Sequence, residues 1–189
     1  MRVTREKAAE NRERIVTTAA KLFREKGFDG VGLDAIMEGV GLTHGGFYRH
    51  FRSKDELAAE AIARGLAASA EKQAAHASLQ DLVCAYLSPA HRDDLRGGCV
   101  VAALGGDIAR QGDGVRRGLT GYVREQLDRL ARWMAGRDER RDPAAREQAI
   151  ATLAGLVGAL VLARAVDDPA LSDEILAAAR AAYGGAEGS

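Results

Sequence analysis

The chain has 189 residues, 47% hydrophobic and 29% charged, which allows one large domain or a small domain beside a larger one. Its two cysteines, Cys84 and Cys99, are too few for a disulfide framework and fit no zinc spacing, so we expect a reducing compartment. The formal net charge is zero, but residues 1–55 carry eleven Lys and Arg against eight Asp and Glu. This local excess predicts an anionic partner for the first part of the chain only.

The N-terminal residues are charged and contain no apolar signal region. The longest apolar stretch, Ile150 to Ala163, is shorter than the ~20 residues that a membrane span needs. We therefore expect a cytoplasmic protein without a membrane partner. No cofactor motif or metal-ligand spacing occurs, so we expect no cofactor and no metal.

Only three prolines occur and alanine is abundant, which predicts an all-α fold of about nine helices and no strands. Thr4 can cap a first helix that ends at Gly27, with Phe28 folding back on Phe23. A second, short helix covers 33–40 and is followed by the turn "GLT".

Thr43 is predicted to cap a third helix, with Phe47 and Phe51 pointing inward because they lie four residues apart. Ser53 and Glu56 form a capping box that opens a fourth helix, to about residue 72. A fifth helix ends at Pro89, and "HRDDLRGG" is predicted to be a loop. The remaining helices are predicted at about 99–110, 115–134, 142–166 (capped by Asp142) and 169–183.

Residues 31–57 combine two short helices, a glycine turn and exposed polar side chains, which is the pattern of a helix-turn-helix. Gly45 and Gly46 would let the backbone approach a major groove. Thr43, Tyr48 and Lys54 offer a hydroxyl, a phenol and an ammonium group to phosphates. The alternative is that the glycines only form turns and the basic cluster is a solvated surface.

The segment "GLTHGGFYRHFRSKDEL", residues 41–57, resembles the recognition segment of the tetracycline-repressor family of bacterial regulators. The matching positions are Gly41, Leu42, Thr43, Phe47, Tyr48, His50, Phe51, Ser53, Lys54 and Leu57. Upstream, "RERIVTTAAKLFREKGFDGVGLDAI" is similar to the family's first helix and the entry to its second. The specific resemblance covers about the first 65 residues.

The resemblance implies a homodimer that represses transcription from a double-stranded DNA operator until a small-molecule effector binds. It implies a DNA-binding domain at 1–55 and a ligand-binding and dimerisation domain at 56–189. The family's DNA contacts correspond by position to Thr43, Gly45, Gly46, Tyr48, His50 and Lys54. The chain departs from the family pattern at Gly32, His44 and Gly46, so base recognition is expected to depend on His44 and Arg49.

The resemblance also implies a ligand cavity in the second domain, and the effector is expected to be hydrophobic or aromatic because the candidates are mostly apolar. These are Tyr86, Cys99, Ala103, Leu104, Tyr122, Gln126 and Trp133, with His91 less favoured; core packing is the alternative role for each aromatic residue.

The last two helices are expected to form the dimer. The expected interface residues are Ala151, Gly155, Ala159, Ala163, Ile175 and Ala179, the first four forming a stripe of small residues. The alternative is that this stripe packs inside the subunit.

The segment "GGCVVAALGGDIARQ" resembles a helix opening in one branch of the family, in some members of which the cysteine senses electrophiles or oxidants. Cys99 is therefore either a sensor or an apolar packing residue, and Cys84 is expected to be inert. Two other function classes are an activator or architectural DNA binder without ligand response, and a thiol enzyme using Cys99, His91 and Asp107. We expect that the chain is not an enzyme, since it has no oxyanion or cofactor motif.

Overall fold

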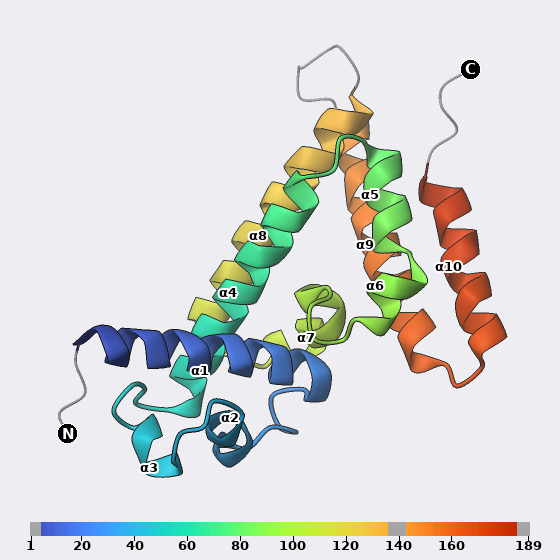
Figure 1. Cartoon of the computed structure of the whole chain (residues 1–189). Helices are drawn as coiled ribbons and strands as arrows, with labels where there is room; N and C mark the ends of the chain where they lie inside the picture. The colour runs from blue at the N-terminus through green and yellow to red at the C-terminus, as the bar shows by residue number, and fades with distance from the viewer. Residues whose placement is uncertain (1–4, 136–142, 185–189) are drawn as a thin grey trace. The chain divides into compact units, whose positions relative to one another are not determined.

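The computed structural model describes residues 5–135 and 143–184, and within them every regular element is a helix (Figure 1). The prediction of an all-α fold with about nine helices is confirmed. The ten described helices are α1 (Arg5–Lys26), α2 (Leu33–Gly39), α3 (His44–Phe47), α4 (Lys54–Ala74), α5 (Leu79–Tyr86), α6 (Pro89–Asp93), α7 (Val100–Ile108), α8 (Asp113–Met134), α9 (Pro143–Ala165) and α10 (Pro169–Tyr183).

The additional helix is α6, in a segment that the sequence predicted to be a loop. Pro89 does not simply end α5; it is the first residue of α6, where a missing N–H has no cost. The Ser88 hydroxyl accepts a hydrogen bond from the His91 amide at 3.1 Å and caps this short helix. The predicted helix caps at Thr4 and Asp142 lie outside the described residues.

The chain divides into two compact units. The first unit comprises the chain up to Ala68 together with Leu95–Gly118, and the second comprises Ser69–Asp94 together with the chain from Leu119 onward. This division follows packing, whereas the predicted boundary at residue 55 separates functions, and that boundary remains a prediction.

In the first unit, α1 packs against α2 and α7. The buried side of α1 includes Ile15, Ala19 and Phe23, all fully buried. The helix ends at Gly27, whose φ of +72° favours glycine and whose amide donates to the Phe23 carbonyl at 2.8 Å. The Phe28 ring then packs on Phe23, with 5.1 Å between ring centroids, as the sequence predicted.

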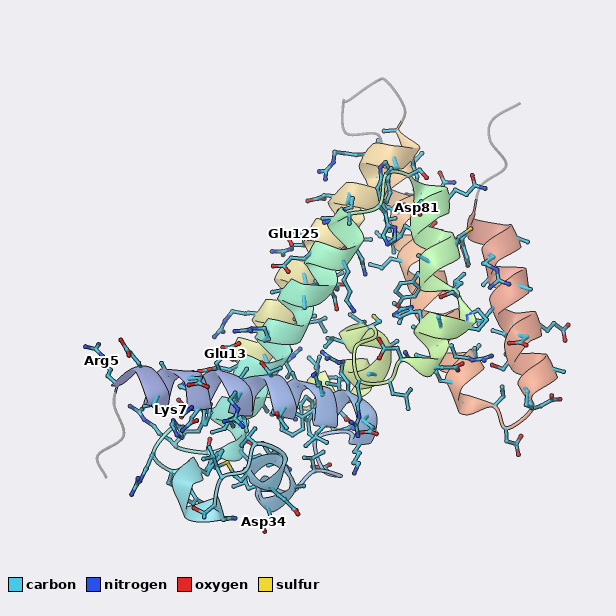
Figure 2. The ribbon with its side chains drawn as sticks, in the orientation of Figure 1. Arg5, Lys7, Glu13, Asp34, Asp81 and Glu125 are labelled. Atoms are coloured by element: carbon cyan, nitrogen blue, oxygen red, sulfur yellow. The ribbon has the colours of Figure 1, made fainter. Side chains whose placement is uncertain are left out.

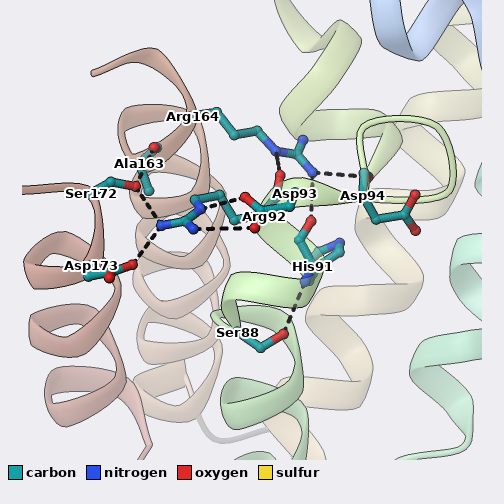
Figure 3. A network of polar contacts seen from close by, with 9 residues as sticks. All are labelled: Ser88, His91, Arg92, Asp93, Asp94, Ala163, Arg164, Ser172 and Asp173. Carbon is teal, nitrogen blue, oxygen red and sulfur yellow. Dashed lines mark hydrogen bonds and ion pairs between the residues drawn. The ribbon is translucent and has the colours of Figure 1, made fainter. Parts of the chain in front are cut away.

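In the second unit, α9 packs against α10 and α6 (Figure 1). A polar network holds these three helices together (Figure 3). Arg92 donates to Ser172 at 2.9 Å and pairs with Asp173 at 2.6 Å. Arg164 donates to the backbone carbonyls of Arg92 and His91, both at 2.9 Å. The Arg164 guanidinium thus bonds carbonyls that the end of α6 leaves without a partner in the helix. The Arg92 guanidinium links α6 to α10 through Ser172 and Asp173.

Helix α9 is long and apolar enough to cross a membrane by length and composition alone, with a mean hydropathy of 1.6 over the relevant window. Only 28% of that window is buried within the chain. One side, including Thr152, Leu156 and Leu160, is buried, while the other exposes Ile150 (50%) and Leu162 (56%). The buried side makes α9 part of the packed second unit, and the exposed side is an apolar surface that needs a partner.

Candidate functional site

The segment from α2 to the start of α4 is built on a glycine turn and two phenylalanines. Gly41 has a φ of +67°, and its amide donates to the Glu38 carbonyl at 2.9 Å, which ends α2. Phe47 and Phe51 are 0% and 2% exposed, and their rings stack with centroids 5.6 Å apart. The predicted inward orientation of both rings is confirmed, and it fixes α3 on the first unit.

The buried rings leave the other side of this segment in solvent. Thr43, His44, Gly45, Tyr48 and Arg49 are exposed, and the Tyr48 side chain is 62% exposed. No heavy atom lies within 4 Å of the position that a Gly45 side chain would take, so the backbone there is open to a ligand. The Thr43 side chain makes no capping bond to α3.

Two of the predicted DNA-contacting side chains already bond within the chain, and a third is half-buried. Lys54 donates from Nζ to the Phe28 carbonyl at 2.6 Å, and His44 Nδ1 lies 2.6 Å from Oδ1 of Asp34, which is labelled in Figure 2. His50 is half-buried, and burial lowers its pKa, with the positive charges of Arg12 and Arg49 adding to the effect. His50 is therefore neutral at neutral pH, and the candidate surface carries its fixed charge on arginines.

Arg12 is a residue of this region that the sequence reading did not identify. Its guanidinium lies over the Phe51 ring, 4.5 Å from the centroid, and pairs with Glu60. Arg12 thereby ties α1 to α4 beneath α3. Its sequence signal is weak, because Glu60 lies 48 residues away along the chain.

The predicted ligand-binding residues are divided between the two units. Cys99, Ala103 and Leu104 belong to the first unit, where Leu104 lines a small apolar gap with Phe23 and Ile62. The second unit holds Tyr86, Gln126, Tyr122 and Trp133. Of these, Tyr86 and Gln126 line one pocket, the Tyr122 hydroxyl accepts a bond from Gln73 at 3.0 Å, and Trp133 packs on the cluster of Leu82 and Leu130.

The pocket of the second unit lies among α4, α5, α8 and α9. Half of its lining residues are leucines, and the other four carry a polar or charged group; small-molecule sites likewise combine apolar walls with a few polar groups. Its lining residues are Gln73, Leu82, Tyr86, Gln126, Arg129, Leu130, Leu153 and Leu156. Sequence reasoning missed Arg129, because a charged residue on a helix usually faces solvent.

Three of the four small residues in the stripe on α9 are covered within the subunit, in line with the alternative of packing inside it, and the dimer interface itself stays a prediction. A side chain at Gly155 would begin 2.2 Å from the Tyr183 ring of α10. Ala159 and Ala163 are 9% and 2% exposed. Ala151 is exposed, and Ile175 and Ala179 are half-buried, so these three remain candidates for an interface.

Cys99 is the N-cap of α7 and is 5% exposed, whereas Cys84 is exposed. The Cys99 Sγ accepts a hydrogen bond from the Ala102 amide at 3.5 Å. The other two members of the hypothetical thiol site have partners other than Cys99: His91 Nδ1 lies 2.6 Å from the Tyr86 carbonyl, and Asp107 pairs with Arg110. In the described part of the chain, no group of three or more His, Cys, Asp or Glu could hold a metal ion.

Comparisons with known proteins agree with this geometry. Residues 15–61 match the family described as bacterial regulatory proteins, tetR family. An HTH-type transcriptional regulator of Staphylococcus aureus is 40% identical over 62 residues, which are 33% of this chain and 34% of that protein. The match therefore spans about a third of the length of this curated relative.

Solved structures extend the likeness beyond the matched residues. A TetR transcriptional regulator of Chloroflexus aurantiacus is 28% identical, with a TM-score of 0.77 over 95% of this chain and 94% of that one. A putative transcriptional regulator of Saccharomonospora viridis, solved in complex with choline, is 18% identical, with a TM-score of 0.72 over 92% and 95%. The latter likeness shows the fold alone. The relatives are transcriptional regulators and not enzymes, in agreement with the expectation from the sequence.

Proposed function

We propose that the chain is a cytoplasmic transcriptional regulator of the tetR family of bacterial regulatory proteins and that it binds DNA through its first unit, which contains the matched residues 15–61. In its full form, the proposal is a homodimeric repressor that leaves an inverted-repeat operator when a small molecule binds the second unit. The observation that carries it is the exposed segment Thr43–Arg49, which lies on two fully packed phenylalanines inside the family match.

The geometry of this segment supports binding in a major groove. Gly45 presents backbone without a side chain, so α3 can approach base edges closely. The Tyr48 phenol and the Arg49 guanidinium are both exposed, and both groups suit phosphate or base contacts. The Asp34 carboxylate holds the His44 ring beside them, which orients that ring for base recognition.

The exposed apolar side of α9 supports a homodimer. Ile150, Val161 and Leu162 on α9, and Leu171 on α10, are each at least 40% exposed. A second copy of the chain would cover these side chains through a two-fold interface. The first units of the two subunits would then bind the two halves of an inverted repeat.

A ligand response is supported by the pocket of the second unit. The S. viridis neighbour holds choline, so a protein of this fold accommodates a small molecule. In this chain the pocket lining contains Arg129, so a cationic ligand such as choline is not favoured here.

The test of this proposal is selection of bound sequences from random double-stranded DNA, followed by binding measurements on the recovered site. We expect an inverted repeat. Tyr48→Ala should weaken binding to all sequences, and Arg49→Ala should change base preference or lower the salt slope by about 0.9 for a lost phosphate contact. Arg124→Ala, an exposed arginine on α8, is the control. Unchanged affinity and salt slope in the Tyr48/Arg49 double variant would contradict DNA binding by this segment.

A further inference from the structure

The pocket of the second unit contains two buried hydrogen-bond donors without partners. Gln126 is 2% exposed, and its Nε2 atom has no hydrogen-bond partner. One terminal nitrogen of Arg129, Nη1, is likewise buried without a partner. Both residues lie on α8, three positions apart, so their side chains leave the same face of the helix. Leaving such groups unpaired costs free energy, and the cost is largest for the charged one.

Among residues 5–135 and 143–184, no acidic side chain lines the pocket beside Arg129. The lining residues include no Asp or Glu. The nearest carboxylates along α8, Glu125 and Asp128, are both exposed, and Glu125 is labelled in Figure 2. Asp128 pairs instead with Arg146 at 2.6 Å. A partly buried guanidinium with one nitrogen, Nη1, buried and unpaired, and with no carboxylate in the lining, can accept an anionic ligand.

The surroundings of the two donors limit the size and shape of that ligand. About 280 Å³ around the two donors is free of atoms when space open to solvent is counted, but the room for the centre of a water-sized sphere is only about 10 Å³. The side chains that line the pocket must therefore move apart to admit a ligand, which favours a small one. Leu82, Leu130, Leu153 and Leu156 provide apolar walls. The Tyr86 ring is fixed by an edge contact with His91, with centroids 4.7 Å apart. The single positive charge of Arg129, among leucines, would neutralise one negative charge on a ligand with an apolar body. It would leave one charge of a phosphate dianion without compensation.

We propose that the effector site binds a small monocarboxylate, with Arg129 and Gln126 donating to the carboxylate and the four leucines contacting its hydrocarbon part. This inference rests on the proposed function, because it names the ligand class of the regulatory site. It narrows the expectation of a hydrophobic or aromatic effector, which gave no role to a charged group.

The first experiment measures binding to the full-length protein in the absence of DNA, by calorimetry. The probes are hexanoate and benzoate, each compared with its neutral amide, and hexyltrimethylammonium is the cationic comparison. We expect the anions to bind and the amides and the cation to bind much more weakly. Arg129→Gln should weaken anion binding roughly tenfold to a hundredfold, as expected for a lost charge-assisted hydrogen bond. Arg132→Gln, an exposed arginine on the same helix, should leave it unchanged.

A second variant tests the same idea without a ligand. Gln126→Glu places a carboxylate beside Arg129, so we expect the melting temperature of the free protein to rise by a few degrees and anion binding to be lost. Equal binding of anions and amides, unchanged anion binding by Arg129→Gln, or a lower melting temperature of Gln126→Glu would each overturn the proposal. Because DNA is absent, failure of DNA recognition and failure of carboxylate recognition are separate results.

Discussion

His91 is held in one tautomer by its surroundings at the junction of α5 and α6. Its Nδ1 lies 2.6 Å from the Tyr86 carbonyl, so the neutral ring donates this bond and Nε2 carries no proton. Burial lowers the pKa of His91, and the charge of Arg164 adds to this, while the Tyr86 carbonyl opposes it. The folded protein therefore disfavours the imidazolium form.

This environment predicts a pH dependence of stability. The folded pKa of His91 lies below its unfolded value near 6.5, so the unfolded state binds more protons as the pH falls through that value. Stability should decrease between pH 7.5 and pH 5.5, measured as the urea midpoint, with half-buried His50 contributing in the same direction. His91→Gln should reduce this decrease. An equally steep decrease in the variant would show that other groups dominate.

The sensing hypothesis needs an accessible Cys99, and the exposures of the two cysteines are the reverse of what it needs. We predict that iodoacetamide labels Cys84 rapidly in the native protein, whereas Cys99 reacts only in denaturant, because Cys99 is 5% exposed. Mass spectrometry of Cys84→Ser and Cys99→Ser variants assigns the label. Rapid native labelling of Cys99, with loss of DNA binding that Cys99→Ser prevents, would restore the sensor role.

At the residue scale, the local sequence pattern predicted which side chains point inward, but it did not predict which groups the side chains contact. The spacing of Phe47 and Phe51 was enough to place both rings inside, because one helical turn separates them. The bond from Lys54 to the Phe28 carbonyl spans 26 residues, so the tertiary fold alone brings the two together. The same holds for Arg129, whose burial depends on four helices that meet around it.

At the scale of elements, α4 passes close to α1 and α7 at Gly65, within the first unit. A Cβ at this position would lie 2.8 Å from Arg24 Nη1 and 2.8 Å from Val100 Cγ2. The arginine can move, but Val100 is β-branched and 1% exposed, so it cannot retreat without disturbing the core.

Gly65→Ala should therefore destabilise the protein by about 1–2 kcal/mol, despite the higher helix propensity of alanine. The matched control is Gly121→Ala on α8, where no heavy atom lies within 4 Å of the new methyl group. That variant should gain about 0.5–1 kcal/mol. Denaturant unfolding measures the change in the free energy of unfolding of both variants. An equal change at the two positions would show that the close approach at Gly65 does not affect stability.

The ends of the helices could be predicted from the sequence wherever a capping or helix-breaking residue has only one possible role. Gly27 and Gly41 ended their helices as predicted, and both adopt positive φ. Ser53 also acts as predicted, since its Oγ accepts from the Glu56 amide at 3.1 Å. Pro89 has two possible roles, because proline can follow one helix or begin the next, and only the Ser88 cap distinguishes them.

At the scale of the whole molecule, the sequence could not decide which side of α9 faces a partner. An almost uniformly apolar helix carries little information on orientation, so small residues were taken as the contact side. In the subunit, Gly155 instead accommodates Tyr183, and substitution there would disturb the packing of α9 on α10 rather than test assembly. The exposed side, with Ile150, Val161 and Leu162, gives a cleaner test.

We predict that Leu162→Glu dissociates the homodimer, because two-fold symmetry places two new carboxylates, one from each subunit, in the interface and away from water. Analytical ultracentrifugation at micromolar concentration should show a dimeric parent and a mainly monomeric variant, with dimer affinity reduced roughly a hundredfold or more. Ala67→Glu, an equally apolar-to-acidic change on the exposed side of α4, should remain dimeric. The monomeric variant should retain its helical content by circular dichroism. It should bind an inverted repeat far more weakly, since a monomer has one first unit and contacts only one half-site. A parent that is monomeric while bound to its operator, or a Leu162→Glu variant that stays dimeric, would exclude this side of α9 as the interface.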